Sequence, residues 1–107
     1  MPATPNELFQ ELSGHFDPEK WGDEDAMLAF EISGDKGGNW VAAVEDGKLS
    51  VREGSVDDAD MTMVCTDEDL MAMVHGDLNP VSAFMAGKVR IKGNMSLAMK
   101  LQTFLTA

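Results

Sequence analysis

Residues 27–52 read MLAFEISGDKGGNWVAAVEDGKLSVR, and this stretch decides the fold. Apolar residues alternate along residues 27–33 and recur along 39–45, which is typical of strands with one buried face. The dipeptide DG at 46–47 favours a two-residue hairpin turn, because Asp-Gly tolerates the positive φ angles that such a turn needs. Residues 48–52 then complete a third strand. The stretch therefore predicts an antiparallel meander of three strands.

On either side of this meander in the sequence, the pattern predicts one helix before it and a mixture of strands and helices after it. Pro5 opens a first helix, since proline suits the first helical turn, and a loop is expected around Trp21. The later elements are a strand at 61–66, helices at 67–75 and 80–86, a strand at 88–92 and a helix at 95–105. We therefore expect an α+β domain with a five-stranded, mainly antiparallel sheet that helices cover on one face.

The 107 residues are enough for one hydrophobic core, so a single domain over residues 1–107 is expected. No stretch approaches the roughly 20 apolar residues of a membrane span, and the N-terminus lacks the pattern of a secretory signal. Cys65 is the only cysteine, which excludes an internal disulfide and fits a reducing compartment. A cytoplasmic location is expected.

The charge of the chain is unevenly placed. The formal net charge is −11, which makes generic nucleic-acid binding unfavourable, because neutralising phosphates needs Lys and Arg. All nineteen acidic residues lie at or before Asp77, whereas residues 78–107 contain only the basic residues Lys88, Arg90, Lys92 and Lys100. The basic segment either lies among acidic neighbours in the fold, or forms a basic patch at a ligand mouth or a membrane-facing edge.

Residues that could support catalysis or hold a metal are scattered. His15 and His75 lie far apart in the sequence, without a serine elbow or metal-ligand spacing beside them. Cys65 lies on the apolar face of the predicted strand, beside Met63, and is expected to be a small buried side chain. The acidic runs at 57–60 and 67–69 lack the glycine and final glutamate of a calcium loop. We therefore expect no metal, no cofactor and no enzymatic activity.

Methionine and wide apolar helix faces are more informative. Seven of the nine methionines lie between Met61 and Met99. On a helical wheel of residues 95–105, Met95 and Met99 fall outside the apolar stripe, which is about 120° wide. The stripe consists of Leu97, Ala98, Leu101, Phe104 and Leu105. The surplus apolar surface has three explanations, which the sequence leaves open: oligomerisation, an exposed patch, or a cavity for an apolar ligand.

Residues 78–105, LNPVSAFMAGKVRIKGNMSLAMKLQTFL, resemble the signature of the sterol carrier protein type-2 family of sterol- and lipid-transfer domains. The match is dense from the acidic helix start at 66–70 onward and includes the runs AFM, GK, GN and LAMKL. The N-terminal half is similar in layout more than in letters. The final tripeptide LTA differs from a peroxisomal signal, so peroxisomal location does not carry over, and a stand-alone prokaryotic member is expected.

The resemblance implies a hydrophobic tunnel between the sheet and the helices. It also implies non-catalytic carriage of a lipid: a fatty acid, a fatty acyl-CoA, or a sterol-like or isoprenoid ligand. The alternative is an accessory protein that presents a quinone intermediate to biosynthetic enzymes. A monomer is favoured over a dimer, and Lys88, Arg90 and Lys92 are candidates for contact with a head group or membrane. The predicted lipid-binding wall is Phe30, Trp40, Met63, Leu70, Met71, Val74, Phe84, Met85, Met95, Met99, Leu101 and Phe104.

Overall fold

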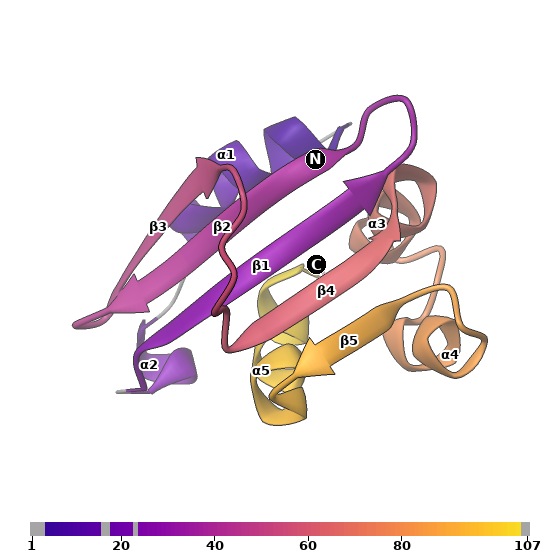
Figure 1. Cartoon of the computed structure of the whole chain (residues 1–107). Coiled ribbons are helices and arrows are strands. Elements are labelled where there is room, and N and C mark those ends of the chain that lie inside the picture. Colours follow the sequence, from indigo (N-terminus) through magenta and orange to yellow (C-terminus); the bar gives the residue numbers. More distant parts are fainter. Residues whose placement is uncertain (1–3, 16–17, 23, 106–107) are drawn as a thin grey trace.

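The computed structural model describes residues 4–15, 18–22 and 24–105, and five helices and five strands follow one another in this part of the chain. Their order agrees with the sequence pattern except near Trp21 (Figure 1). The elements are α1 (Pro5–His15), α2 (Pro18–Trp21), β1 (Ala26–Ser33), β2 (Gly38–Glu45), β3 (Lys48–Glu53), β4 (Met61–Thr66), α3 (Asp67–Val74), α4 (Pro80–Met85), β5 (Arg90–Gly93) and α5 (Met95–Leu105).

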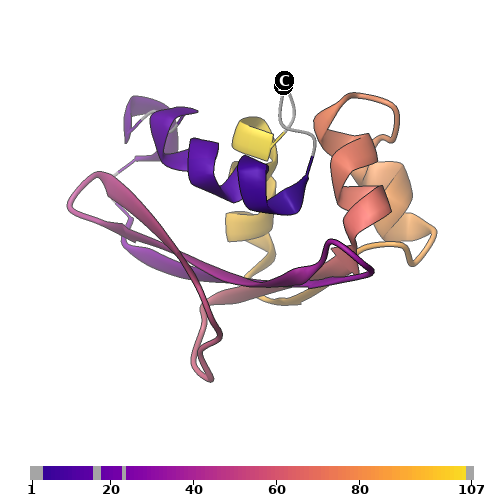
Figure 2. The ribbon, with the colours of Figure 1, turned by 90° about the horizontal axis from the view of Figure 1, so that it is seen from above.

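The five strands form one sheet in the order β3-β2-β1-β4-β5. β1 pairs in parallel with β4, and the other three pairings are antiparallel. Helices α1, α3, α4 and α5 lie on the same face of this sheet (Figure 2). The predicted α+β class, with a mainly antiparallel sheet covered on one face, is therefore confirmed.

The parallel pairing arises from the connection between β3 and β4. Residues 54–60 cross the helix-free face of the sheet and bring β4 beside β1 instead of beside β3 (Figure 1). Hydrogen bonds hold both ends of this crossing: the Gly54 N–H donates to the Asn39 carbonyl at 2.9 Å, and the Asp60 N–H donates to the Met27 carbonyl at 2.8 Å. The Met27 N–H in turn donates to Asp60 Oδ2 at 2.8 Å. The crossing therefore fixes where β4 enters the sheet.

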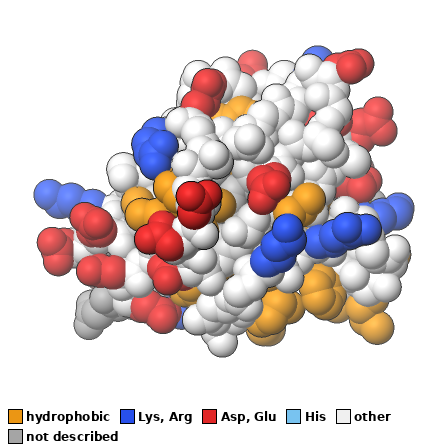
Figure 3. All heavy atoms as spheres, viewed as in Figure 1, with side chains coloured by type: hydrophobic (Ala, Val, Ile, Leu, Met, Phe, Trp, Pro, Cys, Tyr) orange, Lys and Arg blue, Asp and Glu red, His pale blue; other side chains and the backbone are white. Residues whose placement is uncertain are grey.

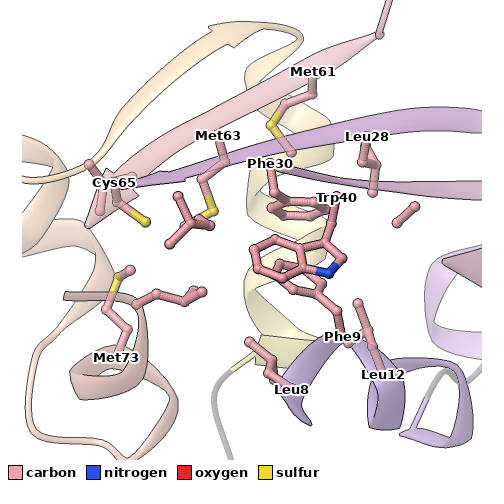
Figure 4. Close-up of a cluster of buried hydrophobic side chains, with 14 of the residues drawn as sticks. Leu8, Phe9, Leu12, Leu28, Phe30, Trp40, Met61, Met63, Cys65 and Met73 are labelled. Atoms are coloured by element: carbon pink, nitrogen blue, oxygen red, sulfur yellow. The ribbon is translucent and has the colours of Figure 1, made fainter. Parts of the chain in front are cut away.

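The hydrophobic core lies between the sheet and the helices and has two parts of different chemistry (Figure 4). One part is aromatic: the Phe9 ring of α1 stacks on Trp40 and lies tilted against Phe30, with both centroid distances at 4.8 Å. The other part lies between β4 and α3, where Met63 and Cys65 face Met73 (Figure 4). Rigid rings pack one half of the core, and flexible methionines fill much of the other half.

Two local expectations differ from the structure. The segment expected to be a loop around Trp21 contains the short helix α2, and the Trp21 indole N–H donates to the Glu24 carbonyl at 2.7 Å. The last strand begins at Arg90 instead of residue 88. Its start is delayed because the N–H groups of Lys88 and Val89 donate to the Ala83 carbonyl, at 2.9 and 3.3 Å, and so close the end of α4.

The internal tunnel that the resemblance implies is not seen in the described part of the chain. The predicted wall residues Phe30, Leu70 and Val74 are buried in the packed core. The side chains of Leu101 and Phe104 lie outside the described residues. The apolar side chains of α4 and α5 that do not pack against the sheet lie on the surface of the molecule.

Candidate functional site

The twelve predicted wall residues fall into groups with different surroundings. Phe30, Trp40, Met63, Leu70 and Val74 are buried, and Met71 is half-buried against the same core. Phe84, Met85, Met95 and Met99 are exposed. The assignment of these residues to lipid binding stays a prediction, but the structure separates an inner set from an outer set.

The outer set forms an apolar patch on α4 and the first turns of α5. Exposed fractions in the patch run from 42% to 81%, although all its members are large hydrophobic side chains. Sequence reasoning missed Val81, which follows Pro80 in the first turn of α4 and carried no periodic signal of its own. The apolar patch consists of Val81, Phe84, Met85, Met95 and Met99.

The local sequence explains why α5 leaves its methionines outside. Asn94 Oδ1 accepts the Ser96 N–H at 2.9 Å and so sets the start of the helix. Leu97 is then buried against the sheet, while Met99 remains 69% exposed. The wheel analysis of residues 95–105 is confirmed for Met95 and Met99, which lie outside the packing face. Of the three explanations for surplus apolar surface, an exposed patch is the one the structure displays.

A basic row lies on β5 and on the residues just before it, next to the apolar patch. Val89 is buried and Ile91 is half-buried on the helix side, whereas Lys88, Arg90 and Lys92, the basic row, are exposed. Arg90 pairs with Val64 and Lys92 with Thr62, which puts both on the helix-free face of the sheet. Figure 3 shows Lys and Arg side chains in a row beside hydrophobic side chains along the lower edge of the molecule. Arg90 and Lys92 therefore lie on the opposite face of the sheet from the helices that carry the apolar patch.

Lys100 has a different role from the basic row. Its Nζ lies 2.9 Å from Glu24 Oε1 and 5.2 Å from the centre of the Trp21 ring. These contacts link α5 to the segment that follows α2, at the far side of the helix layer from α4. The ion pair is partly exposed, so it contributes little to the stability of the fold.

The chemistry available in the described residues is that of an apolar binding site. No polar or charged residue is buried among them, and they contain no group of three His, Cys, Asp or Glu side chains that could hold a metal. Burial, with a smaller contribution from the Asp69 carboxylate, raises the pKa of Cys65 from 9.0 to about 12. The thiol is therefore protonated at neutral pH and unsuited to act as a nucleophile.

The shifted pKa of Cys65 predicts a loss of stability at high pH. An unfolded thiol ionises near pH 9, whereas the folded thiol stays protonated up to about pH 12. The unfolded state thus binds fewer protons between these values, and stability falls as pH rises. At pH 10.5 we expect a loss of about 1–2 kcal/mol in wild type relative to Cys65→Val, measured by urea unfolding under reducing conditions at pH 8 and 10.5. An identical pH dependence of the free energy of unfolding in both proteins would contradict the raised pKa of Cys65.

Membrane insertion by a helix is not supported by the described residues, since none of their helices combines the length and apolarity needed to span a bilayer.

Comparison with known proteins gives consistent results at the level of the family. A model of the SCP-2 sterol transfer family matches residues 8–106. Sterol carrier protein 2 of Oryctolagus cuniculus is 47% identical over 79 residues, which are 71% of this chain and 14% of the rabbit protein. Hydroxysteroid dehydrogenase-like protein 2 of Homo sapiens is 43% identical over 82 residues, 75% of this chain and 19% of that protein. The chain thus spans less than a fifth of these relatives.

Similar solved structures show the same fold in varied settings. The sec-alkylsulfatase Pisa1 from Pseudomonas sp. matches with a TM-score of 0.82 and 24% identity, over 97% of this chain and 16% of the sulfatase. Palmitated SCP2L2 from Aedes aegypti matches with a TM-score of 0.73 and 21% identity, over 95% of this chain and 90% of that one. UbiJ-SCP2, a ubiquinone synthesis protein, has a TM-score of 0.70 and 12% identity, with coverages of 94% and 90%.

Proposed function

The chain belongs to the SCP-2 sterol transfer family, and we propose that it binds a lipid non-covalently and carries it without catalysing a reaction on it. The relatives that are named as enzymes are larger proteins, and this chain matches less than a fifth of each of them.

The apolar patch is the observation that carries this proposal. Several large, exposed hydrophobic side chains on α4 and α5 are uncommon on a monomeric protein unless they bind something. A lipid laid against Met95 and Met99 would remove apolar surface from water on both partners, at about 25 cal/mol per Å². The patch thus forms the mouth of the proposed site.

The methionine side of the core is the proposed interior of the site. Met63 and Met73 lie between β4 and α3, and unbranched thioether side chains change rotamer at little cost (Figure 4). A long acyl chain could replace contacts among these side chains with contacts to itself. Phe30 and Trp40 pack against Phe9 in the aromatic half, so we assign them to the scaffold beside the site instead of to its wall.

The ligand class we propose is a lipid with one long flexible chain, such as a fatty acid or fatty acyl-CoA. A flexible chain fits a site lined by flexible side chains. The palmitated state of the Aedes aegypti protein, which shares the fold, supports this class. Sterol-like and isoprenoid ligands are the other members of the proposed range.

A second candidate function is presentation of a quinone intermediate to enzymes that modify it. The shared fold with a ubiquinone synthesis protein favours this candidate. It uses the same mouth and interior, and it differs in requiring a partner enzyme at the mouth.

One experiment tests both candidates. Protein purified without detergent is examined by native mass spectrometry, its bound lipid is extracted, and uptake of a fluorescent fatty acid is measured in buffer without vesicles. We expect a co-purified lipid that the fluorescent fatty acid displaces. An isoprenoid quinone in the extract would favour the accessory role. The absence of both co-purified lipid and fatty-acid uptake would overturn the carrier proposal.

A further inference from the structure

The methionines of the chain differ sharply in their access to water. Met63 and Met73 lie inside the core and are at most 6% exposed (Figure 4). Met85, Met95 and Met99, the outer methionines, are at least 43% exposed and belong to the apolar patch. Thioether sulfur atoms are therefore open to solvent at the surface that forms the proposed mouth of the lipid site.

We propose that the outer methionines are a site of reversible oxidation by hydrogen peroxide, and that their oxidation releases the bound lipid. The thioether sulfur attacks one peroxide oxygen, and the O–O bond breaks as an S–O bond forms. The displaced hydroxide takes the proton of the transferred hydroxyl group and leaves as water. The sulfur loses two electrons, the peroxide gains them, and the products are one methionine sulfoxide and one water molecule.

The geometry of α5 places the new polar group where the ligand would lie. Met95 and Met99 are one turn apart on the same side of the helix, and Leu97 holds the other side against the sheet. Oxidation converts each flexible apolar side chain into a polar one. The sulfoxide oxygen is hydrated in the free protein and loses this water when an acyl chain covers it. Oxidation therefore weakens the complex with lipid and leaves the free protein folded.

Cys65 does not compete for the oxidant. The thiolate is the form of cysteine that reacts with peroxide, and Cys65 is buried, with a pKa raised to about 12 by that burial. Its thiol is therefore protonated at neutral pH and shielded from solvent. Among the described sulfur atoms, those of the outer methionines are the most exposed.

This inference rests on the proposed function and adds regulation to it. The patch would hold lipid while its methionines are thioethers and release lipid when they are sulfoxides. Methionine sulfoxide reductases A and B, each of which reduces one epimer of the sulfoxide, would restore the apolar surface. An oxidant could thus change the lipid occupancy of the protein without changing its fold.

Peptide mass mapping after treatment of the folded full chain with hydrogen peroxide tests the site of oxidation. The outer methionines should be oxidised at least about tenfold faster than Met63 and Met73, because the fold keeps peroxide away from buried sulfur. Treatment in urea should remove this difference, since unfolding exposes all of these side chains. Equal rates in the folded protein would overturn the assignment of the site.

Binding of a fluorescent fatty acid, measured on the same samples, tests release. Wild type with oxidised outer methionines should bind the fatty acid at least about tenfold more weakly than before treatment, and the two reductases should restore binding. The urea midpoint should hardly change, since exposed side chains contribute little to stability. Unchanged binding after complete oxidation of the outer methionines would overturn the release step. So would a loss of binding that accompanies a large fall in the urea midpoint.

Two variants separate the outer methionines from the other methionines. Met85→Leu/Met95→Leu/Met99→Leu keeps the patch apolar without its sulfur atoms. Peroxide should change its fatty-acid binding by less than about twofold relative to the same variant before treatment. The matched control is Met27→Leu, which removes a half-buried methionine of β1 outside the apolar patch and should lose binding after peroxide as the wild type does. Equal losses in the triple variant and the wild type would overturn the proposal.

Failure of release and failure of lipid carriage give different results. An untreated wild type that takes up no fatty acid would remove the carrier function and the release step with it. The oxidation map would still decide whether the outer methionines are the modified site. An untreated protein that takes up the fatty acid, and binds it equally well after complete oxidation of the outer methionines, would overturn release and leave the carrier function in place.

Discussion

Replacement of Phe30 by alanine is expected to lower the free energy of unfolding by about 3–5 kcal/mol, measured by urea denaturation at neutral pH. The Phe30 side chain is fully buried, and its ring lies 4.8 Å from that of Phe9. It stands on the central strand β1, directly between Trp40 and Met63 of the neighbouring strands. The rigid aromatic surroundings cannot collapse into the space left by the ring, so the cavity adds to the lost burial.

The control for this prediction is Met85→Ala, which also shortens a large apolar side chain. Because Met85 is 81% exposed, its replacement should change the free energy of unfolding by less than about 0.5 kcal/mol. Fatty-acid uptake is measured for both proteins below their unfolding transitions. If Phe30→Ala retained its stability and lost uptake, Phe30 would line the lipid site, and the division of the core into scaffold and site would be wrong.

The sequence predicted most of the sheet because its strands obey local rules. Alternation and the DG turn specify β1 to β3, and β4 has the bounds predicted from the pattern at 61–66. The partner of β4 could not be predicted in the same way. A connection of seven residues, 54–60, can return to either edge of a meander, and hydrogen bonds to Asn39 and Met27, distant in sequence, fix its path. Tertiary contacts determine the pairing of β4 with β1, and the hydrophobic periodicity of the sequence carries no information about such contacts.

The candidate site was predictable in part for a related physical reason. A helical wheel identifies a side chain that does not face the sheet, and Met99 is such a residue. A side chain that is predicted to point inward, in contrast, can belong either to the packed core or to the wall of a cavity. Trp40 alternates inward as expected, yet its partner is Phe9 of α1, the first helix of the chain. The identity of the neighbour decides the role, and the neighbour is set by the fold.

The site itself is tested by Met99→Asp, which should weaken binding of a fluorescent fatty acid by roughly 100-fold, or about 2.7 kcal/mol. The substitution places a charge where the proposed ligand covers the mouth, and a carboxylate loses its hydration when an acyl chain lies against it. Met99 is 69% exposed, so stability should fall by less than about 1 kcal/mol, most of it from the lower helix propensity of aspartate.

The control is Ser96→Asp, because Ser96 is exposed one turn earlier on α5 and lies outside the apolar patch. It adds the same charge to the same helix, and any repulsion of an anionic ligand by net charge should affect both variants alike. Uptake by Ser96→Asp should remain close to that of the wild type. Equal loss in the two variants would mean that charge on α5, not coverage of Met99, governs binding. A loss of stability at Met99 that matches the loss of uptake would place this side chain in the core of the protein in solution.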